Sequence, residues 1–376
     1  MSSADQSTRL PPELWILVLR FALPPRIPFH AEHLPFEDSC PPSHTNRDRL
    51  SFSFVSRYWN SIVTSLGIDS ITLSDDTDAA ALLKYLLEGR KGVYVRRAVV
   101  PFGRTVRSTI KGTIEILAAC PHIQTLIRPE RQDDCFRWNF HAPCPRFNSL
   151  THLEWWHYSD AHRSGGINLF YDVFDSAPNL EYLAIAGQWN PDIIASKRVR
   201  NVHLPRLETL RLRRLSTSFT REIQRWSLPA MFHVISEFGL FETEDRFRSQ
   251  IRTLEFVADM RFYNEDRIRD VLPSCPNLEE VHYYVLFTCV PGVRVQGQGQ
   301  AFGTVRTIGL HAKKNPSWTP VDLGGHLRKH LEFVTGPSFP NLRTLALYGD
   351  WDGLGAGVPL LEPSILQSRI TVIRRL

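Results

Sequence analysis

Three segments decide the fold of this chain: Leu180-Glu-Tyr-Leu183-Ala-Ile185, Leu207-Glu-Thr-Leu210-Arg-Leu212 and Leu342-Arg-Thr-Leu345-Ala-Leu347. Each has an apolar residue at its first, fourth and sixth position. The pattern starts again, twice with a basic sixth residue, at Ile68, Val95, Ile123, Leu150, Ile251, Leu278, Val305 and Ile370. Successive starts lie 27, 28, 27, 30, 27, 44, 27, 27, 37 and 28 residues apart. This near-constant interval indicates an array of repeats, with insertions before Ile251 and before Leu342.

Prolines and helix-like segments mark the other parts of each repeat. Because proline cannot extend a preceding helix, proline two residues before the pattern marks the step from helix to strand; it stands there at Pro121, Pro178, Pro205, Pro276 and Pro340. Apolar residues at helical spacing occur in Ala79–Glu88, Thr109–Ala119, Leu169–Ser176, Asp266–Leu272 and Leu327–Val334. Each unit therefore holds one strand and one helix, and stacked units share a core that no single unit could form.

From Ile68 to the C-terminus this pattern resembles the leucine-rich-repeat family. The resemblance implies an α/β fold, in which a solenoid of about ten strand–helix units occupies residues 67–376. The family usually has Asn or Cys three residues after the third leucine. This chain has other residues there, which marks it as a degenerate member: Tyr158, Gln188, Leu215, Asp259, Leu286, Lys313 and Asp350. The alternative is an ordinary α/β domain with coincidental spacing.

Residues 1–66 form a separate predicted module of two short helices. The first begins at Leu10-Pro-Pro-Glu-Leu14 and carries Leu14, Leu17, Val18 and Phe21 on one stripe. The second covers residues 49–63, and a proline-rich insertion at residues 24–46 separates the two. Two helices of this size bury little apolar surface, so the module needs a partner or the adjoining repeats.

The module resembles the F-box motif. Leu10-Pro-Pro-Glu-Leu14 is similar to its opening, and Val55-Ser-Arg-Tyr-Trp59 to its later segment, with Ser56 where Cys is frequent. The proline-rich insertion is similar to that of F-box-like proteins from mushroom-forming fungi. The resemblance implies docking on the Skp-type adaptor of a cullin–RING ubiquitin ligase through Leu10, Pro11, Leu14, Val55 and Trp59. Alternatively, these residues cap the first repeat.

The residues that alternate with the repeat leucines point to the other face of the predicted sheet. Aromatic and charged side chains gather there, as on recognition surfaces. We therefore predict target binding by Trp156, Tyr182, Arg211, Arg213, Glu255, His282, Tyr284, His311 and Tyr348. Arginines near Arg211 also suggest an acidic or phosphorylated ligand, because guanidinium groups pair with both kinds of anion.

Composition narrows the class of protein. Apolar residues make up 43% and charged residues 22%, as in soluble globular proteins. A net charge of +5 does not argue for a nucleic-acid partner. The polar N-terminus lacks a signal-peptide layout, and no apolar run is long enough to span a membrane. We expect a cytoplasmic or nuclear protein with reduced cysteines and no membrane or nucleic-acid partner.

No catalytic or metal-binding pattern emerges. His30, His33, Cys40 and His44 share one loop, but their spacing matches no familiar zinc site. Neither a Gly-x-Ser-x-Gly elbow nor a His-Glu-x-x-His pair occurs. Cys120 and Cys275 occupy the same repeat slot, which predicts small buried residues. We expect no enzyme activity, metal or cofactor.

Together these features predict the substrate-recognition subunit of an SCF-type ubiquitin ligase, which binds a Skp-type adaptor through its F-box and an unknown target through its repeats. The main alternative is a non-catalytic interaction scaffold whose relic F-box no longer binds the adaptor. No sequence feature favours a third reading, an α/β enzyme or a nucleic-acid binder.

Overall fold

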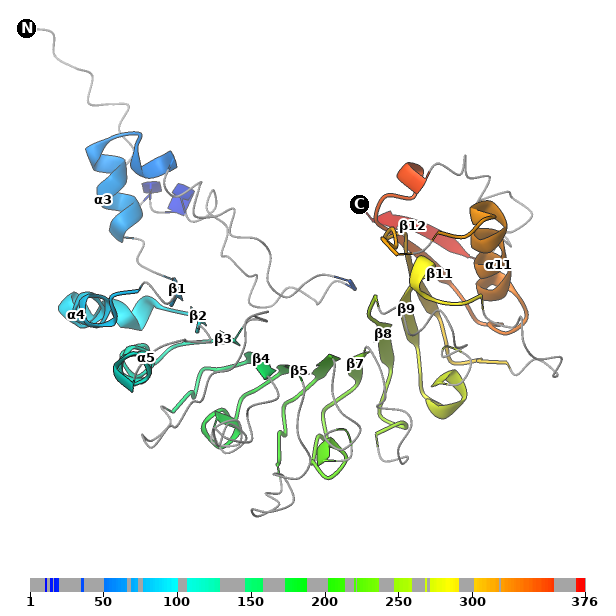
Figure 1. The fold of residues 1–376 in the computed structure, drawn as a ribbon, viewed down its shortest axis with the longest axis horizontal. Helices are drawn as coiled ribbons and strands as arrows, with labels where there is room; N and C mark the ends of the chain where they lie inside the picture. Colours follow the sequence, from blue (N-terminus) through cyan, green and yellow to red (C-terminus); the bar gives the residue numbers. More distant parts are fainter. Residues whose placement is uncertain are drawn as a thin grey trace, which may run out of the picture. The chain divides into compact units, whose positions relative to one another are not determined.

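The structure is a computed structural model (Figure 1). It describes residues 11, 14–15, 17–19, 35–36, 51–65, 69–73, 77–100, 107–128, 146–157, 173–187, 202–213, 220, 222–236, 247–258, 268, 271–290, 301–317, 319–354 and 370–375. Leu10, Ile68 and the four candidate zinc ligands of the N-terminal loop lie outside these residues.

The described strands form a parallel sheet in which neighbours follow chain order from β1 to β12. Their bounds are β1 Ser70–Thr72, β2 Arg97–Val99, β3 Thr125–Arg128, β4 His152–His157, β5 Tyr182–Gly187, β6 Thr209–Arg213, β7 His233–Ser236, β8 Thr253–Phe256, β9 Glu280–Tyr284, β10 Thr307–His311, β11 Thr344–Tyr348 and β12 Thr371–Arg375. One strand per repeat, paired with the repeats before and after it, confirms the predicted α/β repeat array.

Ten of the eleven predicted repeat starts lie two residues before a strand, and the structure corrects two details. The long interval before Ile251 is not a single insertion, because it contains β7. This strand escapes the sequence pattern because Ser236 replaces its third apolar residue. In the last repeat, β12 pairs Leu345 with Val372 and Ala346 with Ile373. The predicted register is therefore wrong by one residue, which moves Ile373 to the face opposite the repeat leucines.

The chain divides into two compact units, of which unit 1 comprises Met1–Glu154 and Arg163–Asn179. In unit 1, β1 to β3 carry Ile71, Ala98 and Leu126 in register, and all three are buried. Among the described residues of this unit, the helices with defined bounds are α3 Arg57–Ser65, α4 Ala79–Leu87, the 3-10 helix η2 Glu88–Tyr94 and α5 Arg107–Ala118. Helices α4 and α5 lie beside each other on one side of the strands (Figure 1). They confirm the helices predicted at Ala79–Glu88 and Thr109–Ala119.

Unit 2 comprises Trp155–His162 and Leu180–Leu376. Its repeat leucines form a continuous buried row, from Leu183 through Leu210, Val234, Leu254 and onward. Helix α11, Leu323–Thr335, lies beside β11 and confirms the helix predicted at Leu327–Val334 (Figure 1). The described part of unit 2 also includes the short 3-10 helices η4 Leu272–Ser274, η5 Val285–Phe287 and η6 Asp352–Leu354.

Asparagine side chains connect successive repeats within each unit. Asn179 Nδ2 donates to the carbonyl of Asn148 over 2.7 Å in unit 1. In unit 2, Asn277 and Asn341 donate over the same distance to the carbonyls of Ser249 and Gly303. All three directly follow a repeat proline, at a different position from the family's usual Asn. The chain thus has inter-repeat asparagine bonds that the sequence pattern did not predict.

Within the residues described, no helix combines the length and hydropathy needed to cross a membrane. The division into units does not fall at the predicted boundary between residues 66 and 67, which stays a prediction.

Candidate functional site

The N-terminal module is organised around two tryptophans of unit 1. The rings of Trp15 and Trp59 lie 5.0 Å apart, and Phe52 stacks on Trp59 at 5.6 Å. Leu19, one helical turn after Trp15, is also buried, with 1% of its surface exposed. Trp15 and Leu19 therefore form the inward stripe of the segment 14–19.

The second predicted helix is not continuous. Residues 51–53 are helical, residues 54–56 break the helix, and α3 begins at Arg57. Ser56 Oγ accepts a hydrogen bond from the backbone N–H of Trp59 over 3.1 Å. Ser56 is thus the N-cap of α3, which gives a physical reason for serine where the F-box resemblance suggests cysteine.

This arrangement leaves the other apolar side chains of the module exposed. Phe54 is 82% exposed and Val55 is 60% exposed, both within the helix break. Leu14, Leu17, Val18 and Tyr58 are 43% to 47% exposed. We call these six residues the apolar docking surface. Its components come from two segments that the Trp15–Trp59 contact holds together.

The predicted adaptor contacts differ in how exposed they are. Pro11, Leu14 and Val55 are exposed, whereas Trp59 is half-buried and packs within the module. Phe54 and Tyr58 are exposed but were not among the predicted contacts. Leu14, Leu17 and Val18 were predicted to share a stripe, but the side that it faces was not predicted. Adaptor binding by these residues stays a prediction.

Strand register places the predicted target-binding residues of unit 2 on one face, opposite the repeat leucines; we call it the polar face. Arg211, Ile235, Glu255 and His282 follow one another in register from β6 to β9. Tyr182 and Arg213 lie on the same side of β5 and β6, because strand residues two apart share a face. The Arg213 guanidinium lies 5.1 Å from the ring centre of Trp156, which joins β4 to this set.

A second row crosses the carboxyl ends of the last four strands. His311 of β10 is in register with Tyr284 of β9 and with Tyr348 of β11, and Tyr348 is in register with Arg375 of β12. We call these four residues the carboxyl-end row. The Lys313 ammonium lies 5.7 Å from the Tyr284 ring centre, and the Arg375 guanidinium lies 5.8 Å from that of Tyr348.

The predicted target-binding residues on the polar face are less exposed than the sequence suggests. Arg213 and His311 are half-buried. The other predicted target-binding residues are at most 9% exposed: Trp156, Tyr182, Arg211, Glu255, His282, Tyr284 and Tyr348. Long side chains on neighbouring strands cover one another, as the 4.7 Å distance between the Tyr284 and His311 rings shows. Their binding of a target stays a prediction.

Small residues make room for rings on this face. A Cβ at Gly309 would overlap the imidazole of His282 and lie 3.0 Å from the ring of Tyr348. The rings of His282 and Tyr348 meet edge-on at 6.3 Å. His282 Nε2 lies 3.4 Å from a carboxylate oxygen of Glu280. This hydrogen bond lowers the pKa of Glu280, and Arg375 contributes to the same shift, although burial opposes it.

Burial also sets the ionisation of the carboxyl-end row. It lowers the pKa of His311 to about 4, and the nearby Lys313 ammonium adds to this shift. It raises the pKa of Tyr348, although Arg375 opposes that shift. Both groups are therefore neutral near pH 7. Lys313 and Arg375 are exposed and carry positive charge at this end of the face.

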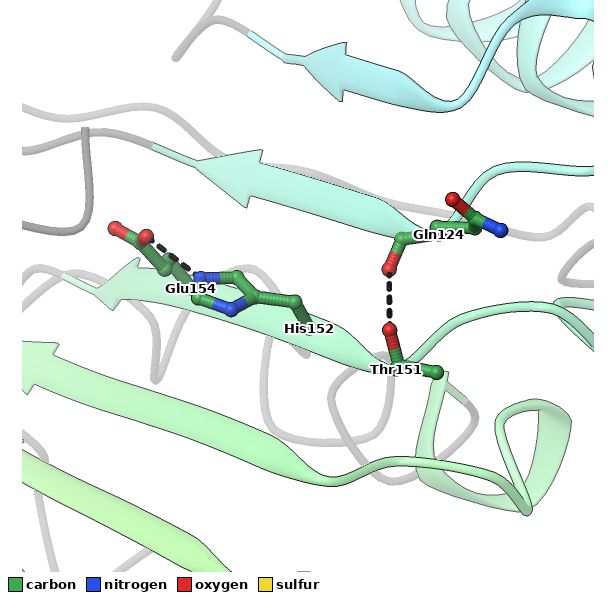
Figure 2. A network of polar contacts seen from close by, with 4 residues as sticks. All are labelled: Gln124, Thr151, His152 and Glu154. Atoms are coloured by element: carbon green, nitrogen blue, oxygen red, sulfur yellow. Dashed lines mark hydrogen bonds and ion pairs between the residues drawn. The ribbon is translucent and has the colours of Figure 1, made fainter. Parts of the chain in front are cut away.

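In unit 1, β4 carries a polar contact of its own (Figure 2). His152 Nε2 lies 2.9 Å from Glu154 Oε1, on one side of the strand. The Gln124 carbonyl accepts bonds from the Thr151 hydroxyl at 3.4 Å and from the backbone N–H groups of Thr151 and His152 at 3.0 Å each. These bonds hold the start of β4 against the preceding repeat.

The structure describes the two cysteines that were predicted to be buried. Cys120 and Cys275 are buried as predicted, with 1% and 2% of their surface exposed. Burial raises the pKa of each thiol to about 12, which suppresses the thiolate. Among the described residues, no group of three or more His, Cys, Asp or Glu could hold a metal ion.

Comparison with known proteins identifies one part of the chain. Residues 44–70 match the F-box domain family. This match covers the later part of the module and α3, but not residues 10–19. No curated protein matches the chain. Among solved structures, it is similar to the leucine-rich repeat-containing protein LegL7 from Legionella pneumophila, with 12% identity, a TM-score of 0.42, and coverage of 81% of this chain and 92% of that one. The chain thus carries a match to the F-box domain at residues 44–70, followed by a parallel array with one strand per repeat.

Proposed function

We propose that this chain is the substrate-recognition subunit of a cullin–RING (SCF-type) ubiquitin ligase. Its F-box binds a Skp-type adaptor, and the polar face of its repeats binds a target protein in the cytoplasm or nucleus. The chain performs no bond chemistry. It acts by proximity, because a tethered target reaches a ubiquitin-loaded enzyme at a high effective concentration.

The apolar docking surface carries this proposal. A soluble protein rarely exposes several large apolar side chains side by side unless a partner covers them. Phe54, at 82% exposure, is the most exposed of the set. Fully burying one such side chain stabilises a complex by roughly 1.5–3 kcal/mol. The F-box match at residues 44–70 supports a Skp-type adaptor as the partner, because F-box domains generally bind such adaptors.

Point variants of the full chain test this assignment. We expect Phe54→Asp and Leu14→Asp to abolish co-purification with a Skp-type adaptor, because each places a charge in an apolar interface. Leu87→Asp is the matched control, since Leu87 is 60% exposed on α4, outside the docking surface. Trp59→Ala should also lose binding, but through the packing of Trp59 on Trp15. Circular dichroism checks that each variant stays folded.

The scaffold with a relic F-box makes a different prediction from the same experiment. In that case the wild-type chain captures a target from an extract but does not bind purified adaptor. Adaptor binding that survives both Phe54→Asp and Leu14→Asp would reject the docking surface itself.

A further inference from the structure

Two cations lie over tyrosine rings at this end of the polar face: Arg375 of the carboxyl-end row, and Lys313, two residues after His311. Lys313 is held over Tyr284 and Arg375 over Tyr348. Both cations are exposed, whereas the two tyrosine rings beneath them are buried. A ligand that approaches this end of the polar face therefore meets positive charge first.

Neither cation has a carboxylate partner within 4.0 Å among the residues that the structure describes. Arg374, the neighbour of Arg375, differs on this point, because its guanidinium lies 3.5 Å from Asp352. Arg374 is in register with Leu347 and so lies on the opposite face of the strand. Two adjacent arginines of β12 thus have different environments: Arg374 pairs with Asp352, whereas the Arg375 guanidinium lies over the Tyr348 ring.

The nearest acidic groups on this face are engaged or buried. Glu255 is 3% exposed, and Glu280 bonds His282 at the amino end of β9. His311 is neutral near pH 7 because burial lowers its pKa to about 4. Glu280 thus lies at the amino end of β9 and Glu255 is in register with the middle of that strand, whereas Lys313 and Arg375 lie at the carboxyl ends.

The cations over the two tyrosine rings bear on whether the partner is a single-stranded nucleic acid or a carboxylate-bearing peptide. Single-stranded nucleic acids stack their bases on open aromatic faces. Here the faces of Tyr284 and Tyr348 already carry cations, and little of either ring is exposed. Carboxylates need only the cations, whose geometry the rings fix in advance.

We propose that the carboxyl-end row binds an acidic segment of the target protein, with Asp or Glu side chains paired to Lys313 and Arg375. The proposal rests on the proposed function in one respect, namely that the polar face holds the target. It adds the chemical class of the segment and the position of its charges.

Fluorescence anisotropy with the purified full chain tests this proposal. The probe is a labelled peptide of alternating Glu and Ala, and its counterpart replaces Glu by Gln. We expect the Glu peptide to bind more tightly, with an affinity that falls as salt rises. The double variant Lys313→Gln/Arg375→Gln should lose about tenfold in affinity, since two exposed ion pairs are removed.

The double variant Lys314→Gln/Arg374→Gln is the matched control, because it removes two charges from the adjacent positions and should keep wild-type affinity. Equal losses in the two double variants would overturn the proposal, as would equal binding of the Glu and Gln peptides. Tighter binding of an oligo-dT probe, lost in the Lys313/Arg375 variant, would replace it with a nucleic-acid site.

The titration needs no adaptor, so the two proposals fail separately. A chain that binds the Glu peptide but no Skp-type adaptor loses only its ligase assignment. A chain that binds the adaptor but shows no preference for the Glu peptide loses only the acidic-segment proposal. Phe54→Asp should leave peptide binding unchanged.

Discussion

The side-chain amide of Asn277 donates to the backbone carbonyl of Ser249, 28 residues earlier, over 2.7 Å. This bond connects the turns before two successive strands. We expect Asn277→Ala to lower the free energy of unfolding by about 1 kcal/mol, the usual contribution of one such bond. Urea denaturation measures the change. Asn277→Asp, which keeps the size but loses the donor, should be at least as destabilising; an unchanged midpoint in both variants would show that the bond contributes nothing.

Gly309 is the position on β10 where a side chain is least tolerated. A Cβ there would overlap the His282 imidazole, so Gly309→Ala should destabilise the chain by about 1–3 kcal/mol. Gly303→Ala is the control, because the nearest atom to its Cβ is Asn341 Nδ2 at 3.7 Å, an ordinary contact. Adding His282→Ala to Gly309→Ala should recover part of the loss. Without that recovery, the clash with His282 would not be the cause.

Ser56 caps the helix that holds Trp59 against Trp15. Ser56→Ala should weaken α3 by about 1 kcal/mol, whereas Ser56→Asp keeps an N-cap acceptor and should retain most of its stability. Hydrogen exchange measured on the α3 peptide should be faster in the Ala variant alone. If both variants exchange at the wild-type rate, the Ser56 hydroxyl has no capping role.

A buried histidine of α11 should make stability depend on pH. Burial lowers the pKa of His330 to about 3, and the neighbouring His326 contributes to this shift. His330 is therefore neutral in the folded state but takes up a proton in the unfolded state below its ordinary pKa of 6.5. Its contribution to stability is fully present above pH 6.5 and is lost as the pH falls toward 3.

Urea midpoints across this pH range measure the effect. His330→Phe should show a shallower loss between pH 6.5 and the acid limit, because it removes the titrating group. Tyr283→Phe is the control, since it removes the 3.2 Å contact to His330 Nδ1 but keeps the histidine, and so should keep the slope. Equal slopes in the wild type and His330→Phe would assign the pH dependence to other groups.

Thiol labelling should distinguish the described cysteines. Cys120 and Cys275 are buried and their pKa values are about 12, so iodoacetamide at pH ~8 should leave both unmodified in the folded chain. Cys289 is half-buried and should react before them. Peptide mapping by mass spectrometry gives the order, and full labelling in urea is the positive control. Early modification of Cys120 would mean that its repeat opens readily.

Much of the strand array was predictable, because the repeat leucines occupy equivalent buried positions on successive strands. The pattern failed at β7, where Ser236 occupies a buried position that the template reserves for an apolar residue. It failed again at β12, where both Val372 and Ile373 are apolar and either could face the core. One extra apolar residue is enough to leave a strand register undetermined by sequence.

The docking surface was predicted only in outline. An apolar stripe on a short helix predicts that the stripe is buried. The sequence does not show whether the chain's own core or a partner protein covers it. In the structure, Trp15 and Leu19 take the inward positions and leave Leu14, Leu17 and Val18 outside. The asparagine bonds between repeats were missed for another reason. Asn277 and its equivalents lie in the turn before the strand, a position that the family pattern does not include.

The pairing of each strand with its neighbours along the chain in unit 2 has a consequence for the gain and loss of whole repeats. From β8 to β11, each strand bonds only the strand before it and the strand after it. Duplicating or deleting one whole repeat, such as the 27 residues from Ile251 to Asn277, would recreate the same pairing at the new junction. Gain or loss of a whole repeat therefore changes the polar face while leaving the residues of the F-box match unchanged.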